Sequence, residues 1–170
     1  MWDGDFWNER AAGASQFWRR LTSKLKPSLG AAVGSIHAVC TSMNPLAQEL
    51  RDRVKRFAIR LVRFVRTLRR DAATDAISRQ LIRAGTSTSA NYHATCRSRS
   101  RAEFVAKLGV VLEEADETEH WLDVLFLGEL ASGSEVDWLR NESRELRAIF
   151  HASVKTARAN YSKTLKSRKL

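Results

Sequence analysis

The sequence predicts an all-α fold, an antiparallel up-down-up-down four-helix bundle. From Leu46 onward, apolar residues recur at steps of three and four, which is the period of amphipathic helices. The chain of 170 residues has only two prolines and eight glycines, so few positions interrupt the backbone. No segment alternates apolar and polar residues as half-buried strands do. Short connections between four such helices favour the bundle.

Residues 1–42 differ from the rest, and we expect them to be a poorly ordered extension with one short helix near Phe6–Leu25. The weakly apolar stretch from Leu29 to Cys40 is interrupted and begins too far from the N-terminus for a typical signal peptide. An alternative is that Met43 is the true start and that the extension comes from a misassigned upstream codon.

The first helix is expected from Leu46 to about Arg70, after the helix-entry signal of Pro45. Its apolar residues fall within one arc of about 120° and predict the buried face. They are Val54, Phe57, Ala58, Leu61, Phe64, Val65 and Leu68.

The second helix is expected to begin with Thr74 as its N-cap. Its predicted inner face comprises Ala76, Ile77, Leu81, Ile82, Ala84 and Ala90. Residues 84–90 read as a loop by propensity, because serine, threonine and glycine are mediocre or poor helix formers. The flanking periodicity instead favours a continuous helix whose small side chains let a neighbouring helix approach closely.

The third helix is expected from about Arg99 to Leu127, capped by Ser98 or Ser100. Its stripe comprises Phe104, Leu108, Val111, Leu112, Ala115, Thr118, Trp121, Leu122 and Leu125. The fourth helix is expected from a capping box at Ser134 to about Ser162. Its stripe comprises Val136, Leu139, Leu146, Ile149, Phe150 and Val154. We therefore expect a bundle domain over residues 43–165 and a basic tail over residues 166–170.

Charge and composition favour a binding protein over an enzyme. The net charge of +10 and the pI of about 10.3 suit a polyanionic partner. Cys40 and Cys96 form neither a disulfide framework nor a zinc site, which fits a reducing cytoplasm. Glu117 and His120 match the Glu-x-x-His motif of di-metal bundles, but no second copy exists. We expect no metal, no cofactor, no catalytic residue and no membrane partner.

Arginines on the outer side of the first helix, continued on the second, are the candidate nucleic-acid-binding residues. They are Arg53, Arg56, Arg60, Arg63, Arg66, Arg70, Arg79 and Arg83. A guanidinium group binds phosphate or carboxylate bidentately, so the same residues suit two functions. One is contact with RNA or DNA; the alternative is pairing with the acidic third helix, between Glu113 and Asp123, within or between subunits. Simple solvation is the third possibility.

Two polar residues of the second helix are expected to be structural. Asn91 lies one turn after Ser87, and we expect a buried amide that bonds across helices and fixes their register. Neither Ser87 nor Ser89 has a histidine–acid pair placed to activate it. Trp121 is expected in the core or a subunit interface, and Trp138 is expected to pack against the loop that enters the fourth helix.

Two long runs resemble a known family. They are residues 79–92, RQLIRAGTSTSANY, and residues 107–118, KLGVVLEEADET. Both resemble the four-helix-bundle family first noticed in intervening sequences of bacterial 23S ribosomal RNA genes, whose relatives include the accessory variability determinant of diversity-generating retroelements. The match continues in residues 148–158 and covers about Met43 to Arg158. It departs after Asn91, where Tyr92 begins YHAT and many members read IAEG.

The resemblance implies a non-catalytic bundle that assembles into a homo-oligomeric ring. For the retroelement relatives it implies a pentamer whose basic surface binds nucleic acid and a reverse transcriptase. We therefore expect nucleic acid, self-association and a reverse transcriptase or other protein as candidate partners. An adaptor that uses its arginines for assembly or docking is the alternative function.

Overall fold

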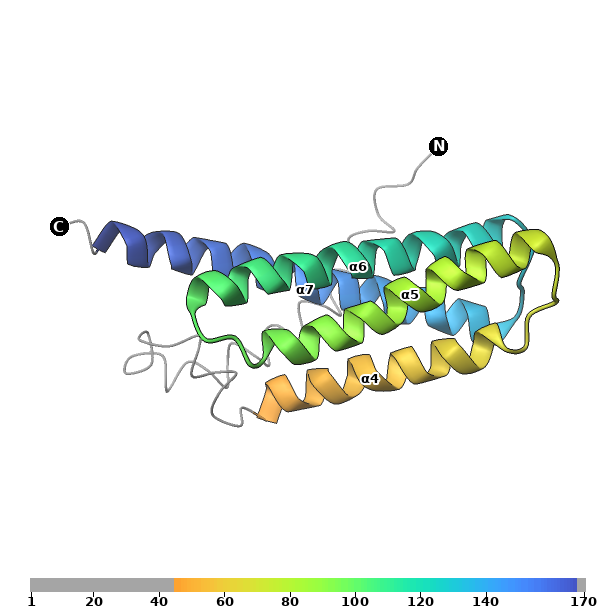
Figure 1. Ribbon diagram of the computed structural model, residues 1–170, viewed down its shortest axis with the longest axis horizontal. Helices are drawn as coiled ribbons and strands as arrows, with labels where there is room; N and C mark the ends of the chain where they lie inside the picture. Colours follow the sequence, from red (N-terminus) through yellow and green to blue (C-terminus); the bar gives the residue numbers. More distant parts are fainter. Residues whose placement is uncertain (1–44, 168–170) are drawn as a thin grey trace.

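The computed structural model describes residues 45–167, and the expected N-terminal extension lies outside them. The described chain contains four helices, α4 (Pro45–Val65), α5 (Ala72–Thr95), α6 (Arg101–Leu127) and α7 (Ser134–Ser167), with no strand among them. Successive helices run antiparallel, and the end of α7 projects beyond its neighbours (Figure 1). The predicted four-helix bundle is confirmed. In it α4 packs on α5 and, more loosely, on α7, whereas α6 lies diagonally opposite α4.

The first helix is shorter than the sequence predicted. α4 ends at Val65 and not near Arg70, because the next residues tighten into a turn. The N–H and the hydroxyl of Thr67 both donate to the carbonyl of Phe64, at 2.9 and 2.7 Å. Leu68 still packs against the core from this turn.

The N-cap of α5 is Asp71, so the expected Thr74 cap is wrong. The Asp71 backbone is extended, and its carboxylate accepts a hydrogen bond from the Thr74 N–H at 2.9 Å. Thr74 lies within the first turn and is buried. Ser100 caps α6 as expected, accepting from the Glu103 N–H at 3.1 Å.

The start and end of the fourth helix also need correction. α7 begins at Ser134, with the Asp137 N–H donating to the Gly133 carbonyl, so Gly133 precedes the helix where a serine cap was expected. The helix continues to Ser167 and not to about Ser162. Arg101, at the start of α6, donates a hydrogen bond to Thr164 and so ties this last segment to the bundle.

The small-residue run in α5 is helical throughout, as the periodicity predicted. Its hydroxyl groups donate to carbonyls one turn back, Thr86 to Ile82 at 2.7 Å and Thr88 to Ala84 at 2.9 Å. These internal bonds satisfy the hydroxyls without a partner helix. The buried face of α5 is therefore largely small or polar: Thr74, Ser78, Leu81, Ala84, Gly85, Thr88, Tyr92 and Thr95.

The predicted inner face of α5 was partly wrong, because Ala76 and Ala90 are exposed. The expected close approach occurs at Gly85. A Cβ there would lie 2.6 Å from Leu61 Cδ2 of α4 and 3.7 Å from Thr118 Cγ2 of α6. Three helices thus meet at one glycine. The predicted stripes of the other helices form the rest of the core, including Phe57, Leu61, Leu122 and Phe150, all of them essentially inaccessible.

Candidate functional site

The eight predicted arginines divide into two equal sets. Arg53, Arg60, Arg70 and Arg83 pair with acidic side chains. Arg56, Arg63, Arg66 and Arg79 are exposed and form no ion pair with any residue that the structure describes. The expected continuous arginine surface is therefore only half available to a partner.

The paired arginines of α4 bind acids of α7, so the alternative of pairing with the third helix within one subunit is wrong for them. Arg53 makes a bidentate contact with Glu142 at 2.6 and 2.8 Å and also reaches Glu145. Arg60 holds Glu135 with two bonds of 2.7 Å. The hydrogen bonds that these guanidinium groups donate to the glutamates raise the pKa of both arginines, which therefore stay charged. α7 provides the partners because it lies beside α4, whereas α6 does not.

Four acids of the third helix, Asp116, Glu117, Glu119 and Asp123, have partners of their own. Asp123 accepts from Arg140 and Arg144, and Glu119 accepts from Arg147. On the other side of α6, Arg83 of α5 reaches Glu117. A hydrogen bond from the Trp121 indole has the largest effect on the pKa of Glu117 and lowers it, and the hydrogen bond from Arg83 lowers it further. The acidic cluster on α6 is therefore largely neutralised within the chain.

A row of cations remains on the solvent side of α4. We call Lys55, Arg56, Arg63 and Arg66 the outer row; all four side chains are exposed, and none has an ion-pair partner among the described residues. Lys55, Arg56 and Arg63 fall within about 100° of the helix circumference, and Arg66 follows in the turn after α4. Ile59, with 44% of its surface exposed, lies among them.

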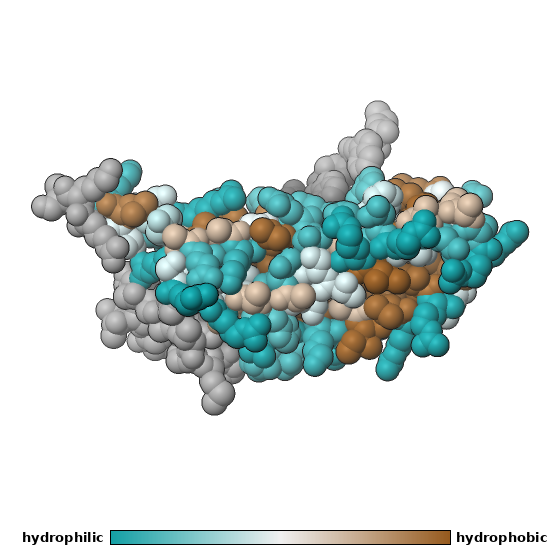
Figure 2. All heavy atoms as spheres, viewed as in Figure 1, coloured by the Kyte–Doolittle hydropathy of each residue, from teal (hydrophilic) through white to brown (hydrophobic). Residues whose placement is uncertain are grey.

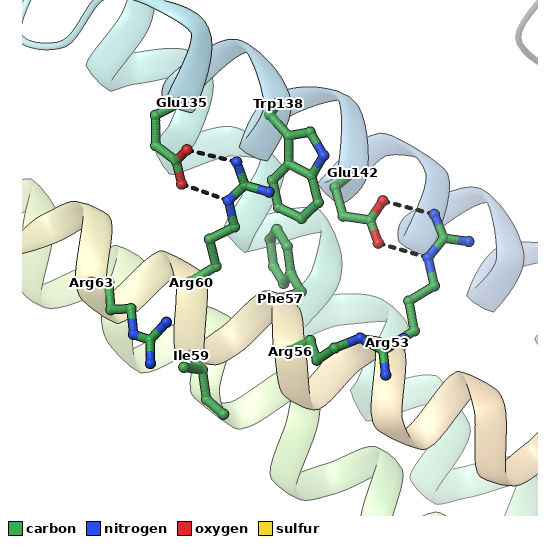
Figure 3. Close-up of a pocket in the computed structure, with 9 residues that line it drawn as sticks. All are labelled: Arg53, Arg56, Phe57, Ile59, Arg60, Arg63, Glu135, Trp138 and Glu142. Atoms are coloured by element: carbon green, nitrogen blue, oxygen red, sulfur yellow. Dashed lines mark hydrogen bonds and ion pairs between the residues drawn. The ribbon is translucent and has the colours of Figure 1, made fainter.

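Beside the outer row, α4 and α7 enclose an open groove of about 790 Å³. Its lining comprises Arg53, Arg56, Phe57, Ile59, Arg60, Arg63, Glu135, Trp138 and Glu142. Figure 3 shows Trp138 of α7 between the Arg60–Glu135 and Arg53–Glu142 pairs, above Phe57. Long charged side chains bridge this seam where closer helices would pack apolar side chains, which leaves the groove open.

Trp138 carries the aromatic surface of the groove. It is 36% exposed, and the Arg60 guanidinium carbon lies 3.7 Å from its ring centroid, a cation–π contact. The two hydrogen bonds to Glu135 hold that guanidinium in place. Trp138 therefore contacts α4, and the expectation that it packs against the entry loop missed this partner.

The polar pair of α5 bonds within its own helix. The Asn91 amide donates to the Ser87 hydroxyl at 3.0 Å, one turn away, and Asn91 is half-buried. The expected bond across helices is therefore wrong, because the neighbouring turn supplies an acceptor. Trp121 is half-buried against the core as expected, and its indole N–H donates to Glu117 at 3.1 Å.

His93 gives the bundle a stability that depends on pH. Burial, and then the charges of Arg51, Lys55 and Arg97, lower its pKa below the ordinary 6.5, with Asp52 opposing them. A lowered histidine pKa means that the unfolded chain takes up the proton first as pH falls. The contribution of His93 to the stability of the fold is therefore complete above pH 6.5. It is lost as the pH falls from 6.5 through the pKa of His93 in the folded state.

We expect the urea concentration at which half of the full chain is unfolded to decrease as the pH is lowered from 7.5 to 5.5, roughly the window set by histidine titration. His93→Gln should fall less over the same window, because glutamine does not titrate. His151→Gln is the matched control, since that histidine is exposed on α7 and should leave the fall unchanged. Identical pH profiles for the wild type and His93→Gln would contradict this account.

No group of three or more histidine, cysteine, aspartate or glutamate side chains among the described residues could hold a metal ion. None of their helices is long and apolar enough to cross a membrane. The fold and the site together define a helical bundle with an exposed cationic row beside an open aromatic groove.

The chain belongs to the family of the 23S rRNA-intervening sequence protein, whose model matches residues 48–152. It is also similar to a solved structure, a protein of unknown function from the S23 ribosomal protein family of Bacteroides thetaiotaomicron. The two share 31% identity with a TM-score of 0.59, over 64% of this chain and 97% of that one. No curated protein matches the sequence. The resemblance to the intervening-sequence family seen in the sequence is thereby confirmed.

Proposed function

We propose that this chain is a non-catalytic, self-associating bundle that binds nucleic acid or a ribonucleoprotein, largely without reading base sequence. The main support for this proposal is the outer row, which has four exposed cations with no acidic partner among the described residues. Phosphates bind such cations and release counterions, and this term does not depend on sequence. The family description, 23S rRNA-intervening sequence protein, refers to a ribosomal RNA and is consistent with a nucleic-acid partner.

The ion pairs support this assignment of roles. Arg53 and Arg60 already have acidic partners on α7, so they hold the bundle together within one chain. The nucleic acid contacts the outer row and also Arg79 on α5, which is exposed. Self-association would use other surfaces, for example around Val110 and Leu127 on α6, which are 42% and 72% exposed.

The experiment is light scattering coupled to size exclusion on the full chain, with and without a mixed-sequence RNA or DNA oligonucleotide. We expect an oligomer that takes up the oligonucleotide at low salt and releases it at high salt. Phosphate contacts weaken as salt competes for the same charges. An oligomer indifferent to both nucleic acids at low salt would contradict binding and favour an adaptor that docks a protein partner.

A further inference from the structure

Phosphate binding by the outer row assigns no role to the groove between α4 and α7. Two of its arginines, Arg56 and Arg63, belong to the outer row and stand unpaired on its α4 side. The other two are neutralised by Glu135 and Glu142, so the groove keeps a net positive charge. Its interior presents the ring of Trp138 above buried Phe57 (Figure 3). An occupant must therefore combine negative charge with a flat, apolar surface.

We infer that this groove binds an unpaired base of single-stranded nucleic acid, stacked at Trp138 and Arg60, with the adjoining phosphates on Arg56 and Arg63. The inference rests on the proposed function and specifies its ligand. Aromatic rings and guanidinium planes are the surfaces on which unstacked bases bind. Here both occur together, because Arg60 lies on the Trp138 ring and Glu135 fixes its orientation.

The spacing of the cations suits a strand that runs along α4. Arg56 and Arg63 are seven residues apart, hence about 10 Å along the helix axis and on the same side. A flexible single strand can set phosphates on both and turn a base into the groove between them. A duplex keeps its bases paired and stacked, so it can contact the outer row but cannot fill the groove.

Acidic carboxylates would compete for the same arginines but are a poorer fit to the groove. Glu135 and Glu142 already occupy the carboxylate-binding edges of Arg60 and Arg53. What remains open is the exposed part of Trp138 and the two unpaired guanidinium groups. The volume of about 790 Å³ lies in the range of small-molecule sites and accommodates a nucleotide unit.

The test compares the full chain bound to fluorescently labelled oligo(U) and to an RNA hairpin duplex of equal charge, by anisotropy at one fixed salt concentration. Trp138→Ala should weaken oligo(U) binding by about tenfold, the scale of one lost base–aromatic stack, and leave duplex binding within about twofold. Trp138→Phe should restore most of the affinity for oligo(U). Leu165→Ala is the control, an exposed apolar residue of α7 outside the groove, and should change neither.

The outcomes separate this inference from the proposed function. If neutralising Arg56 and Arg63 weakens both ligands while Trp138→Ala weakens neither, or both equally, the base-stacking inference is wrong and phosphate binding stands. If neutralising them changes neither ligand, both fail. Displacement of oligo(U) by a glutamate- and phenylalanine-rich peptide, with tighter binding of that peptide than of oligo(U), would assign the groove to a protein segment and overturn the inference.

Discussion

Replacing Arg56, Arg63 and Arg66 with glutamate is expected to weaken nucleic-acid binding by roughly a hundredfold at low salt. The change removes three phosphate-binding cations and puts three repelling anions in the same row. The three side chains are exposed and have no ion-pair partner among the described residues, so the bundle itself should remain folded. Anisotropy with a labelled oligonucleotide measures the loss, and far-UV circular dichroism checks the fold.

The choice of residues matters, because Arg60 would confound the result. A glutamate at that position would face Glu135 and break the contact between α4 and α7. The matched control is the triple change of Lys155, Arg158 and Lys163 on α7 to glutamate, which alters the net charge equally. These three side chains are also exposed and unpaired among the described residues. An equal loss in both triple variants would show that only total charge counts, against a defined site on α4.

Gly85→Leu is expected to destabilise the bundle by about 3 kcal/mol or more. Even the first added atom would lie 2.6 Å from Leu61 Cδ2, and Leu61 is itself fully buried. A leucine side chain adds three further carbons where α4, α5 and α6 meet, and the packed core has no room for them. Urea unfolding followed by circular dichroism measures the change. Gly85→Ala should cost far less, since alanine gains helix propensity and adds one atom.

A compensating change tests the cause of that loss. Leu61→Ala alone should cost about 2–5 kcal/mol through the cavity it leaves. Combined with Gly85→Leu, it restores much of the lost volume, so the double variant should be more stable than the sum of the two single changes predicts. Strict additivity would mean that the leucine at position 85 does not meet Leu61, and the close approach described here would be wrong.

The sequence predicted the fold well because three of the four helices carry large apolar stripes. Val54 and Phe57 in α4, or Leu139 and Phe150 in α7, recur at helical steps and are buried as expected. The α5 stripe was harder to predict. Its buried face includes Ser78 and Thr88, and the Thr88 hydroxyl donates to the Ala84 carbonyl one turn back. No hydropathy pattern marks such residues as core.

The candidate site was predicted by residue type but not by partner. In the sequence, an arginine that binds a carboxylate cannot be told from an arginine that faces solvent. The order of the helices around the bundle decides which of the two occurs. A signal did exist in the spacing. Arg53 and Arg60 are seven residues apart, as are Glu135 and Glu142, and the antiparallel order pairs Arg60 with Glu135 and Arg53 with Glu142.

The Trp138 groove had no comparable signal. The groove depends on the distance between α4 and α7. The long side chains that form ion pairs between the two helices set this distance, together with the Arg60 guanidinium on the Trp138 ring. Figure 2 likewise shows apolar side chains that reach the surface among hydrophilic ones, near the end of the bundle where α4 finishes and α5 begins. Such local surface features depend on tertiary packing and not on helical periodicity.

The salt dependence of affinity tests most directly whether the outer row binds phosphates. We would measure the slope of log affinity against log salt for a single-stranded oligonucleotide, with Arg56, Arg63 and Arg66 replaced by glutamine. Three lost phosphate contacts should reduce the steepness of that slope by about 2. The control with Lys155, Arg158 and Lys163 replaced by glutamine should keep the wild-type slope. A slope unchanged by the α4 substitutions would contradict the assignment of phosphate binding to the outer row.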